Sequence, residues 1–275
     1  MSGRLAGKIA IVTGSTRGIG RGIAEMFAAE GARVVVTGRS REAGNEVKSA
    51  ITGAGGEAIY VPTDVGREED IAAMVAVTLA AYGRLDILVN NAAPTELVGP
   101  GREDRAADAL STESWERILR VALTGVFWSC KHALPAMIAG GGGAILNISS
   151  GASVLGVAGI DAYTAAKGGI NALTRSLAVE YAPRGIRANC LVLGMVLTSP
   201  GAVAMAEDPV LGPAIRSIHL TRLGVPADVA YAATYLCSDE AAFVTGAALA
   251  VDGGVTCKLA VPNLSEAAVK LDKRG

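Results

Sequence analysis

Short aliphatic runs alternate along the chain with longer segments in which apolar residues recur every three to four positions. The short runs are rich in valine and isoleucine and predict buried strands at residues 8–13, 33–37, 57–62, 86–91, 143–149, 186–193 and 247–252. The amphipathic segments predict helices at 18–30, 67–82, 112–139, 161–182 and 226–238, with a further polar helix ending at Gly53. Pro135 predicts an interruption or bend in the long 112–139 helix.

Strands that are apolar throughout are typical of a parallel sheet covered on both faces. Right-handed crossovers through the helices then predict an α/β fold: a Rossmann-type, doubly wound sheet of about seven strands in the order 3-2-1-4-5-6-7. No linker or internal repeat divides the pattern. We therefore expect a single domain over residues 1–257, followed by a C-terminal extension over 258–275.

Two long connections interrupt the alternation, one over 92–111 and one over 194–225. Each follows a predicted strand, so both should lie at the carboxyl edge of the sheet, where open α/β sheets bind their ligands. Long connections in compact domains are more often functional than idle. The second connection carries few charged residues, which favours an apolar ligand.

Composition narrows the possible functions. The 275 residues are 51% apolar with a net charge of −1, and the scattered lysines and arginines form no surface for nucleic acid or an anionic membrane. The four cysteines include no C-x-x-C pair and only two histidines are present, so we expect neither disulfides nor a metal site. The N-terminal apolar run is too short for a signal peptide, and no uninterrupted apolar run is long enough to span a membrane. We expect a cytoplasmic protein.

The segment TGSTRGIG, residues 13–20, joins the first strand to the first helix. Gly14 permits a tight turn, Gly18 allows the backbone to approach a phosphate, and Gly20 lets the helix pack closely on the strand. The free N–H groups that open the helix favour a pyrophosphate. A glycine pattern alone is often a simple turn, but its place between strand and helix predicts a dinucleotide site, formed by Gly14, Ser15, Thr16, Arg17, Gly18, Ile19 and Gly20.

The residues after the second strand predict which dinucleotide binds. NAD sites usually place an acid there to hold the ribose 2′-hydroxyl, whereas residues 37–40 read TGRS and no acid precedes Glu42. Arg39 and Arg17 can instead pair with a 2′-phosphate, because guanidinium groups bind phosphate in a bidentate manner. We therefore predict NADP(H) rather than NAD(H). The alternative is that both arginines are solvated surface residues.

A tyrosine and a lysine stand four residues apart in YTAAK, residues 163–167, on one face of a predicted helix. This spacing alone is weak evidence. Together with TGSTRGIG, NNA at 90–92 and NISSGAS at 147–153, in this order, it resembles the short-chain dehydrogenase/reductase family. The resemblance covers residues 5–256 and is nearest to the 3-oxoacyl-carrier-protein reductases and related secondary-alcohol dehydrogenases.

The resemblance implies an oxidoreductase that transfers a hydride between NADP(H) and a ketone, secondary alcohol or 3-oxoacyl group. Tyr163 would be the general acid/base, and Lys167 would lower the phenol pKa and hydrogen-bond the nicotinamide ribose. Ser150 would hold the substrate oxygen and stabilise its developing charge. Ser149 is the rival for this role, and the same alignment assigns it to the supporting strand.

The resemblance assigns five further residues to the cofactor: Asp64, Val65, Asn91, Val196 and Thr198. Asp64 and Val65 would contact the adenine ring, although an aspartate at this place can equally cap the following helix. Asn91 would lie near the cofactor ribose, while Asn90 would support the sheet. Val196 and Thr198 would close over the carboxamide.

The chain departs from the family pattern most importantly at Ala122. The family typically has an asparagine there, whose backbone holds a water that relays protons to the lysine. Because alanine favours a regular helix, we expect a functional but slower relay. The alternative function is a catalytically weakened relative that binds the dinucleotide for regulation or assembly.

Helices 112–139 and 161–182 carry more apolar residues than one sheet face should cover: Val121, Leu123, Val126, Phe127, Trp128, Ile170, Leu173, Leu177 and Val179. The family pairs these helices between subunits, usually in tetramers. We therefore expect a D2 homotetramer, no nucleic-acid or membrane partner, and a small, apolar carbonyl or alcohol substrate.

Overall fold

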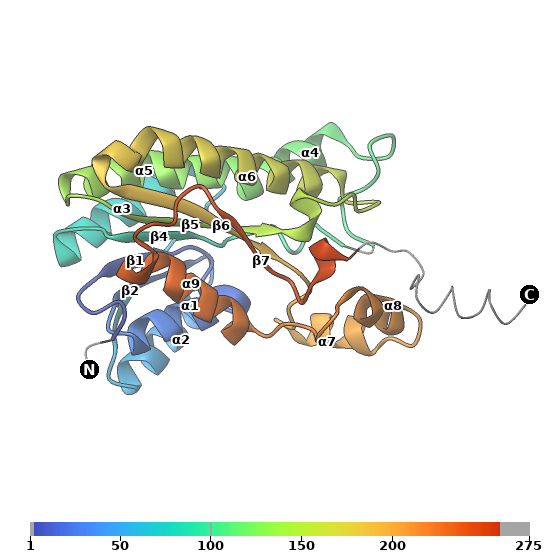
Figure 1. Ribbon diagram of the computed structural model, residues 1–275, viewed down its shortest axis with the longest axis horizontal. Coiled ribbons are helices and arrows are strands. Elements are labelled where there is room, and N and C mark those ends of the chain that lie inside the picture. Colours follow the sequence, from blue (N-terminus) through green and yellow to red (C-terminus); the bar gives the residue numbers. More distant parts are fainter. Residues whose placement is uncertain (1–2, 100, 259–275) are drawn as a thin grey trace, which may run out of the picture.

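A seven-stranded parallel sheet runs through the centre of the computed structural model, which describes residues 3–99 and 101–258 (Figure 1). Its strands are β1 (Ile9–Val12), β2 (Arg33–Gly38), β3 (Glu57–Pro62), β4 (Ile87–Asn90), β5 (Gly143–Ser150), β6 (Ile186–Leu193) and β7 (Ala248–Val251). They are ordered β3-β2-β1-β4-β5-β6-β7, which confirms the predicted fold class and strand order. The expected C-terminal extension lies outside the described residues, apart from Lys258.

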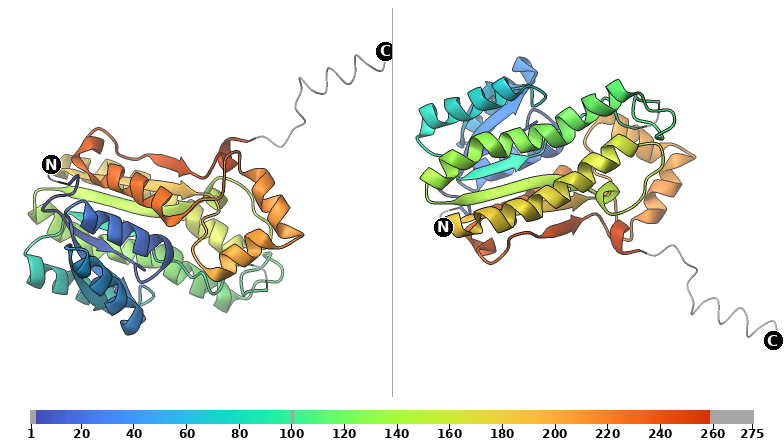
Figure 2. Two further views of the ribbon diagram at one scale, coloured as in Figure 1. Left: turned by 90° about the horizontal axis from the view of Figure 1, so that it is seen from below. Right: turned by 90° about the horizontal axis from the view of Figure 1, so that it is seen from above.

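Helices cover both faces of this sheet (Figures 1 and 2). One face carries α1 (Gly18–Ala29), α2 (Arg41–Gly53) and α9 (Pro226–Cys237), and the other carries α3 (Glu68–Tyr82), α5 (Gly125–Ala139) and α6 (Asp161–Tyr181). Successive strand side chains alternate between the two layers: Val12 packs in the first and Ile11 in the second, and both are fully buried. Apolar residues at every strand position are therefore what this two-sided burial requires.

The carboxyl ends of the strands meet at one edge, and both long connections lie there. The 194–225 connection contains two helices that the pattern did not predict, α7 (Pro200–Glu207) and α8 (Leu211–Ile218), which project beyond the sheet (Figure 2). The hydroxyl of Ser199 caps α7 by accepting from the N–H of Ala202 (3.2 Å), and Pro200 occupies the first turn. Serine followed by proline is a helix-start signal. The start of α7 could therefore be predicted from this pair of residues, although not from the apolar periodicity.

The predicted interruption of the long helix near Pro135 is wrong. Helix α5 continues through Pro135, and the break lies earlier, in a π-helical turn at Arg120–Thr124 between α4 (Thr112–Leu119) and α5. Across this turn the N–H of Gly125 donates to the carbonyl of Arg120. A π turn adds a residue to the hydrogen-bonded ring and is found frequently at functional sites.

The helical run Thr112–Ala139 is long and apolar enough to cross a membrane by length and composition alone. In the structure 44% of its most apolar window is buried, and α5 packs in the layer beneath the sheet with α3 and α6. Core helices of soluble proteins meet the same criterion. This feature is therefore weak evidence for a membrane location.

Candidate active site

A cleft of about 590 Å³ opens at the carboxyl edge of the sheet. Its walls come from the glycine-rich turn, the end of β5, helix α6 and the first residues of the 194–225 connection. Three side chains predicted to carry the chemistry line it: Ser150, Tyr163 and Lys167. The end of β5 and the start of α6 thus place all three candidate catalytic groups in one cleft with the glycine-rich turn.

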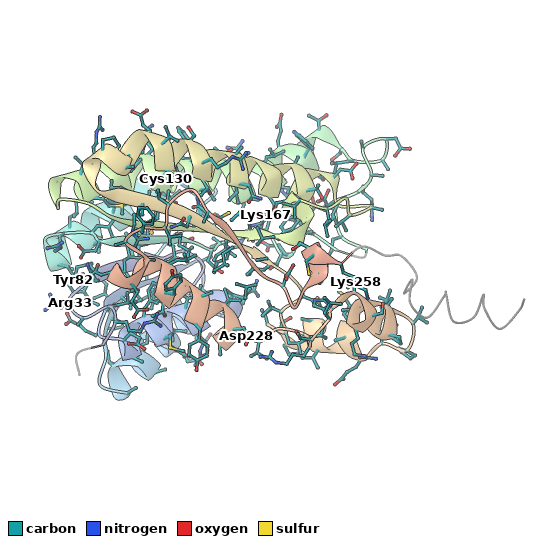
Figure 3. All side chains as sticks on the ribbon, viewed as in Figure 1. Arg33, Tyr82, Cys130, Lys167, Asp228 and Lys258 are labelled. Atoms are coloured by element: carbon teal, nitrogen blue, oxygen red, sulfur yellow. The ribbon has the colours of Figure 1, made fainter. Side chains whose placement is uncertain are left out.

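Lys167 is held beneath α6, facing the sheet (Figure 3). It is 2% exposed, and its Nζ donates to the carbonyl of Ile148 (2.7 Å). Burial lowers the pKa of this ammonium to about 8. The Nζ atom lies 5.4 Å from the centre of the Tyr163 ring, so the predicted pair is confirmed as a spatial pair.

Tyr163 lies half-buried at the start of α6. Burial raises the pKa of its phenol, and the neighbouring Ser150 hydroxyl opposes this effect as a hydrogen-bonding partner. The lowered phenol pKa expected from the tyrosine–lysine spacing is therefore not produced by these protein groups alone.

Ser150 and Ser149 have different environments. Ser150 ends β5 and lines the cleft, and its hydroxyl accepts from the N–H of Ala152 (3.3 Å). Ser149 is 2% exposed and donates to the carbonyl of Lys167 (3.3 Å). Both serines line the cleft, but the Ser149 hydroxyl already donates to a backbone carbonyl, so Ser150 stays the predicted partner of the substrate oxygen.

The glycine-rich turn has the shape that a phosphate group needs. Gly14 and Gly18 have φ angles of 63° and 56°, a region that side chains rarely adopt. A Cβ at Gly20 would lie 2.4 Å from the carbonyl oxygen of Gly14. Helix α1 starts directly after Arg17, which provides no side-chain cap, so its first N–H groups are left for another acceptor. These residues fit a dinucleotide pyrophosphate.

Two predicted cofactor residues hold the turn from behind. Ser15 is fully buried, and its hydroxyl donates to a β1 carbonyl (2.7 Å) and accepts from the N–H of Thr37 (2.9 Å). The Asn91 amide donates to the carbonyls of Thr13 (2.9 Å) and Gly14 (3.1 Å), while the residue also lines the cleft. Ser15 therefore fixes the turn rather than offering its hydroxyl to a ligand.

A smaller cavity of about 70 Å³ adjoins the turn and is lined by Asp64, Val65 and Arg39. Asp64 accepts from the N–H of Gly66 (2.9 Å), while the N-cap position of α3 is Arg67. The alternative in which Asp64 caps α3 is therefore not observed. Thr16 packs against Gly38 beside this cavity, since a Cβ at Gly38 would lie 2.7 Å from its methyl group.

The two arginines predicted to bind a 2′-phosphate both have partners in the 92–111 connection. Arg39 Nη2 pairs with Glu96 Oε1 (2.8 Å), and Arg17 Nη2 lies 3.4 Å from the hydroxyl of Thr95. Burial raises the pKa of Glu96, but hydrogen bonds, including that from Arg39, outweigh it and hold the pKa below its usual value. Sequence reasoning missed Glu96, because no periodicity marks an irregular connection.

The remaining cofactor candidates close the cleft. Thr198 packs against Gly18, where an added Cβ would lie 3.2 Å from the threonine Cβ. Val196 pairs with Gly224 in a parallel bridge, and Ile19 also lines the cleft. Within the described ranges, 3–99 and 101–258, no group of three metal-ligating side chains comes together.

Ala122 is fully buried inside the π turn. The expectation that alanine would produce a regular helix here is wrong. A Cβ at Gly125 would lie 2.6 Å from the carbonyl oxygen of Val65. Glycine therefore allows this helix to pack closely on the loop that follows β3. The π turn therefore forms with alanine at position 122, and the close packing of Gly125 on Val65 lies directly after it.

Comparison with known proteins agrees with this site. Residues 14–256 match a family model described as enoyl-(acyl carrier protein) reductase. The chain belongs to the short-chain dehydrogenase/reductase family. Members of this oxidoreductase family use nicotinamide dinucleotides, which is consistent with the glycine-rich turn.

Individual relatives cover nearly the whole chain. A 3beta-hydroxysteroid dehydrogenase from Eggerthella lenta is 40% identical over 254 residues, 92% of this chain and 95% of that protein. A 3-oxoacyl-(acyl-carrier-protein) reductase from Chlamydia pneumoniae is 38% identical over 92% of this chain and 98% of its own length. The crystal structure of gox2181 superposes with a TM-score of 0.86 at 30% identity, covering 93% of this chain and 98% of that chain.

Proposed function

We propose that the protein is an NADP(H)-dependent oxidoreductase that interconverts a ketone, or 3-oxoacyl group, and a secondary alcohol. The observation that carries this proposal is the cleft shared by Ser150, Tyr163, Lys167 and the glycine-rich turn. The named activities of the relatives, a hydroxysteroid dehydrogenase and a 3-oxoacyl reductase, are of this reaction class.

The side chains divide the chemistry among them. In reduction Tyr163 donates its hydroxyl proton to the substrate oxygen, and in oxidation it accepts that proton. Ser150 donates a hydrogen bond to the same oxygen and stabilises its developing charge. A nicotinamide cofactor held by the glycine-rich turn and Lys167 would supply the hydride and, in its oxidised form, a positive charge. Lys167, whose Nζ lies 5.4 Å from the centre of the Tyr163 ring, is the cation of the protein closest in role to this charge and would favour the phenolate once the cofactor is bound.

Lys167 can also anchor the nicotinamide ribose. An ammonium group has three donors, and the carbonyl of Ile148 takes one. The other two remain for the cofactor and the proton relay. Because the pKa of Lys167 is about 8, the ammonium is charged at neutral pH and begins to lose this charge in mildly alkaline solution.

Preference for NADP(H) rests on Arg39 and Arg17. Arg39 pairs with a carboxylate oxygen of Glu96 (2.8 Å), and a phosphate oxygen is an anionic acceptor of the same kind. Binding of the 2′-phosphate would therefore replace Glu96 on the guanidinium. NAD(H) lacks this group and leaves the pair intact.

The substrate is proposed to be apolar. Met195, Val196 and Ala202 line the same cleft as Tyr163. The charged residues of its lining are Arg17, Glu96, Arg102 and Lys167, of which we assign Arg17 and Lys167 to the cofactor. A steroid or other ring alcohol suits such walls better than a strongly charged compound.

The same scattered charge that argues against a nucleic-acid partner supports a soluble, cytoplasmic enzyme.

The Ala122 departure no longer favours a catalytically weakened relative. The π turn is present with alanine in place, so the irregular backbone does not depend on an asparagine side chain. We therefore retain the proton relay in the proposed mechanism, with the backbone of this turn as its support.

Assembly into a D2 tetramer is also proposed. Val126, Ile170 and Leu177 are buried within one protomer, whereas Phe127 and Val179 are 49% and 81% exposed on the outer side of α5 and α6. A groove of about 420 Å³ lies between these two helices. Further exposed apolar residues come from α9, the edge strand β7 and the connection between them: Tyr231, Tyr235, Phe243 and Leu249. Exposed apolar residues on these two sets of elements suit the two dyad interfaces of a D2 tetramer.

Replacement of Tyr163 by phenylalanine tests the mechanism. Tyr163→Phe should lower kcat for ketone reduction at least about a hundredfold, because general acid catalysis is lost. Binding of NADPH, followed by its fluorescence, should stay nearly unchanged. Tyr181→Phe, at the other end of the same helix, is the matched control and should keep full activity. Turnover of Tyr163→Phe within a few-fold of the parent contradicts the mechanism.

Cofactor preference is tested at Arg39. Arg39→Asp should shift the ratio of kcat/KM values from NADPH toward NADH about tenfold or more, since a charge-assisted contact to phosphate is lost. Glu96→Gln should improve NADPH alone, because Arg39 is then released. The control is Arg33→Asp. Arg33 begins β2, at the end of this strand far from Arg39, and its ion pair is with Glu57 of β3. An unchanged ratio in Arg39→Asp means that the 2′-phosphate is not held there.

The assembly is tested by light scattering at micromolar concentration. We expect the mass of a tetramer, and a smaller species for Phe127→Glu, because the charge would have to be buried between copies. A monomeric parent protein rules out the proposed assembly.

The relay is tested by a pair of variants at the π turn. Ala122→Asn should change kcat by less than about twofold, because the turn is already formed. Gly125→Ala should lower kcat several-fold more, since its Cβ would lie 2.6 Å from the Val65 carbonyl oxygen and displace the turn. The two values of kcat should be compared across pH with saturating NADPH. A large gain in Ala122→Asn shows that the alanine does limit proton delivery.

A further inference from the structure

The first turn of α6 has no cap of its own. Its N-cap residue is Ile160, whose side chain cannot accept a hydrogen bond. The N–H groups of Asp161, Ala162 and Tyr163 precede the first intrahelical bond, which runs from Thr164 to the carbonyl of Ile160 (2.9 Å). Unpaired backbone donors in a protein interior are costly, so these three need acceptors from elsewhere in the chain.

A carboxylate far away in the sequence, that of Asp104, supplies two of these three acceptors. Asp104 Oδ1 accepts from the N–H of Ala162 (3.2 Å), and Oδ2 accepts from the N–H of Tyr163 (3.0 Å). The neighbouring Arg105 carbonyl accepts from the N–H of Asp161 (3.3 Å). Asp104 is 59 residues before Tyr163 and only 1% exposed. The side chain therefore acts as an N-cap that reaches the helix from the 92–111 connection.

The cap is itself fixed in place. The N–H of Asp104 donates to the carbonyl of Leu97 (2.9 Å), which closes its loop. In the other direction, Asp161 Oδ2 accepts from the N–H of Ala107 (2.9 Å). The loop and the first turn of the helix are thus bound to each other from both sides.

The charge of Asp104 suits this position. A buried carboxylate is costly unless hydrogen bonds and positive charge stabilise it. The positive end of the 21-residue helix α6 faces it, and its oxygens accept three backbone N–H groups, including that of Arg105 (3.0 Å). An aspartate therefore forms stronger hydrogen bonds to the backbone of this turn than a neutral capping residue would.

The same loop supports the tyrosine ring. Leu97 and Ile118 form a small apolar cluster with Ala162, separate from the two main layers, and Tyr163 packs against it. The connection thus holds the backbone of Tyr163 through Asp104 and contributes Leu97 to the apolar cluster against which the tyrosine packs.

We propose that Asp104 is a positioning residue that sets the place of the Tyr163 phenol in the active site; this rests on the proposed acid/base role of Tyr163. Lys167 is held independently by the carbonyl of Ile148, and Ser150 by β5. Loss of the cap therefore moves Tyr163 relative to the other two groups and leaves them in place. Proton transfer weakens, while the cofactor contacts of the glycine-rich turn and Lys167 remain.

The test compares three variants in the full-length protein. Asp104→Ala removes both acceptors, and Asp104→Asn keeps one of them. Asp161→Asn removes a charge from the same helix end but does not touch the Tyr163 N–H, so it is the matched control. For each, kcat with a ketone substrate, KM for NADPH and hydrogen exchange of the 161–164 backbone are measured.

We expect Asp104→Ala to lower kcat roughly ten- to hundredfold, the loss that misplacement of a reacting group by about 1 Å can cause. KM for NADPH should stay within about twofold, Asp104→Asn should fall between parent and alanine variant, and Asp161→Asn should resemble the parent. Hydrogen exchange should rise at 161–164 in Asp104→Ala and not around Lys167.

Two results overturn the proposal: unchanged exchange at 161–164 in Asp104→Ala, or a kcat within about twofold of the parent in that variant. A general loss of structure, seen as increased exchange throughout α6 with an equal effect in Asp161→Asn, also overturns it. Failure of the proposed function is seen separately, as turnover in Tyr163→Phe equal to that of the parent. Hydrogen exchange still decides the capping role in that case.

Discussion

The contact between α6 and the end of β5 is the constraint on which the active site depends. The Nζ atom of Lys167 donates to the carbonyl of Ile148 (2.7 Å), and the hydroxyl of Ser149 donates to the carbonyl of Lys167 (3.3 Å). Both bonds are buried, where hydrogen bonds are stronger than in water. Because β5 ends in Ser150, the same contact sets the distance between the strand and the helix that carry the three candidate catalytic groups. The burial that makes this contact rigid also lowers the pKa of Lys167 to about 8.

The 92–111 connection completes the site from the opposite side. Glu96 and Thr95 hold the arginines proposed to bind the 2′-phosphate, and Asp104 caps the helix that carries Tyr163. One irregular segment therefore contacts both the arginines of the proposed cofactor site and the helix that carries the proposed general acid/base. Connections of this kind vary readily in length and sequence, so substitutions here can change the contacts of the proposed cofactor site and of Tyr163 without changing the sheet.

The fold could be predicted from the sequence because strand burial on two faces leaves a strong apolar pattern. The same pattern says nothing about isolated contacts. Pro135 was expected to interrupt or bend the long helix, yet α5 continues through it and the α-helical pattern is interrupted at Arg120–Thr124. There a π turn forms, and Gly125 directly after it packs closely on Val65. The catalytic candidates were found by motif, whereas Asp104 acts across 59 residues and has no local signal. The raised pKa of Tyr163 likewise depends on burial, which only the folded chain creates.

Transfer of a deuterium label tests the central claim most directly. The purified protein is mixed with NADPH carrying deuterium at C4 of the nicotinamide, prepared separately with each of the two C4 configurations, and with a panel of cyclic ketones and 3-oxoacyl thioesters. The account predicts that one of the two preparations delivers its label to the carbinol carbon of an alcohol product, in step with NADPH consumption. Tight binding of NADPH with no label in any product, from either preparation, would contradict it.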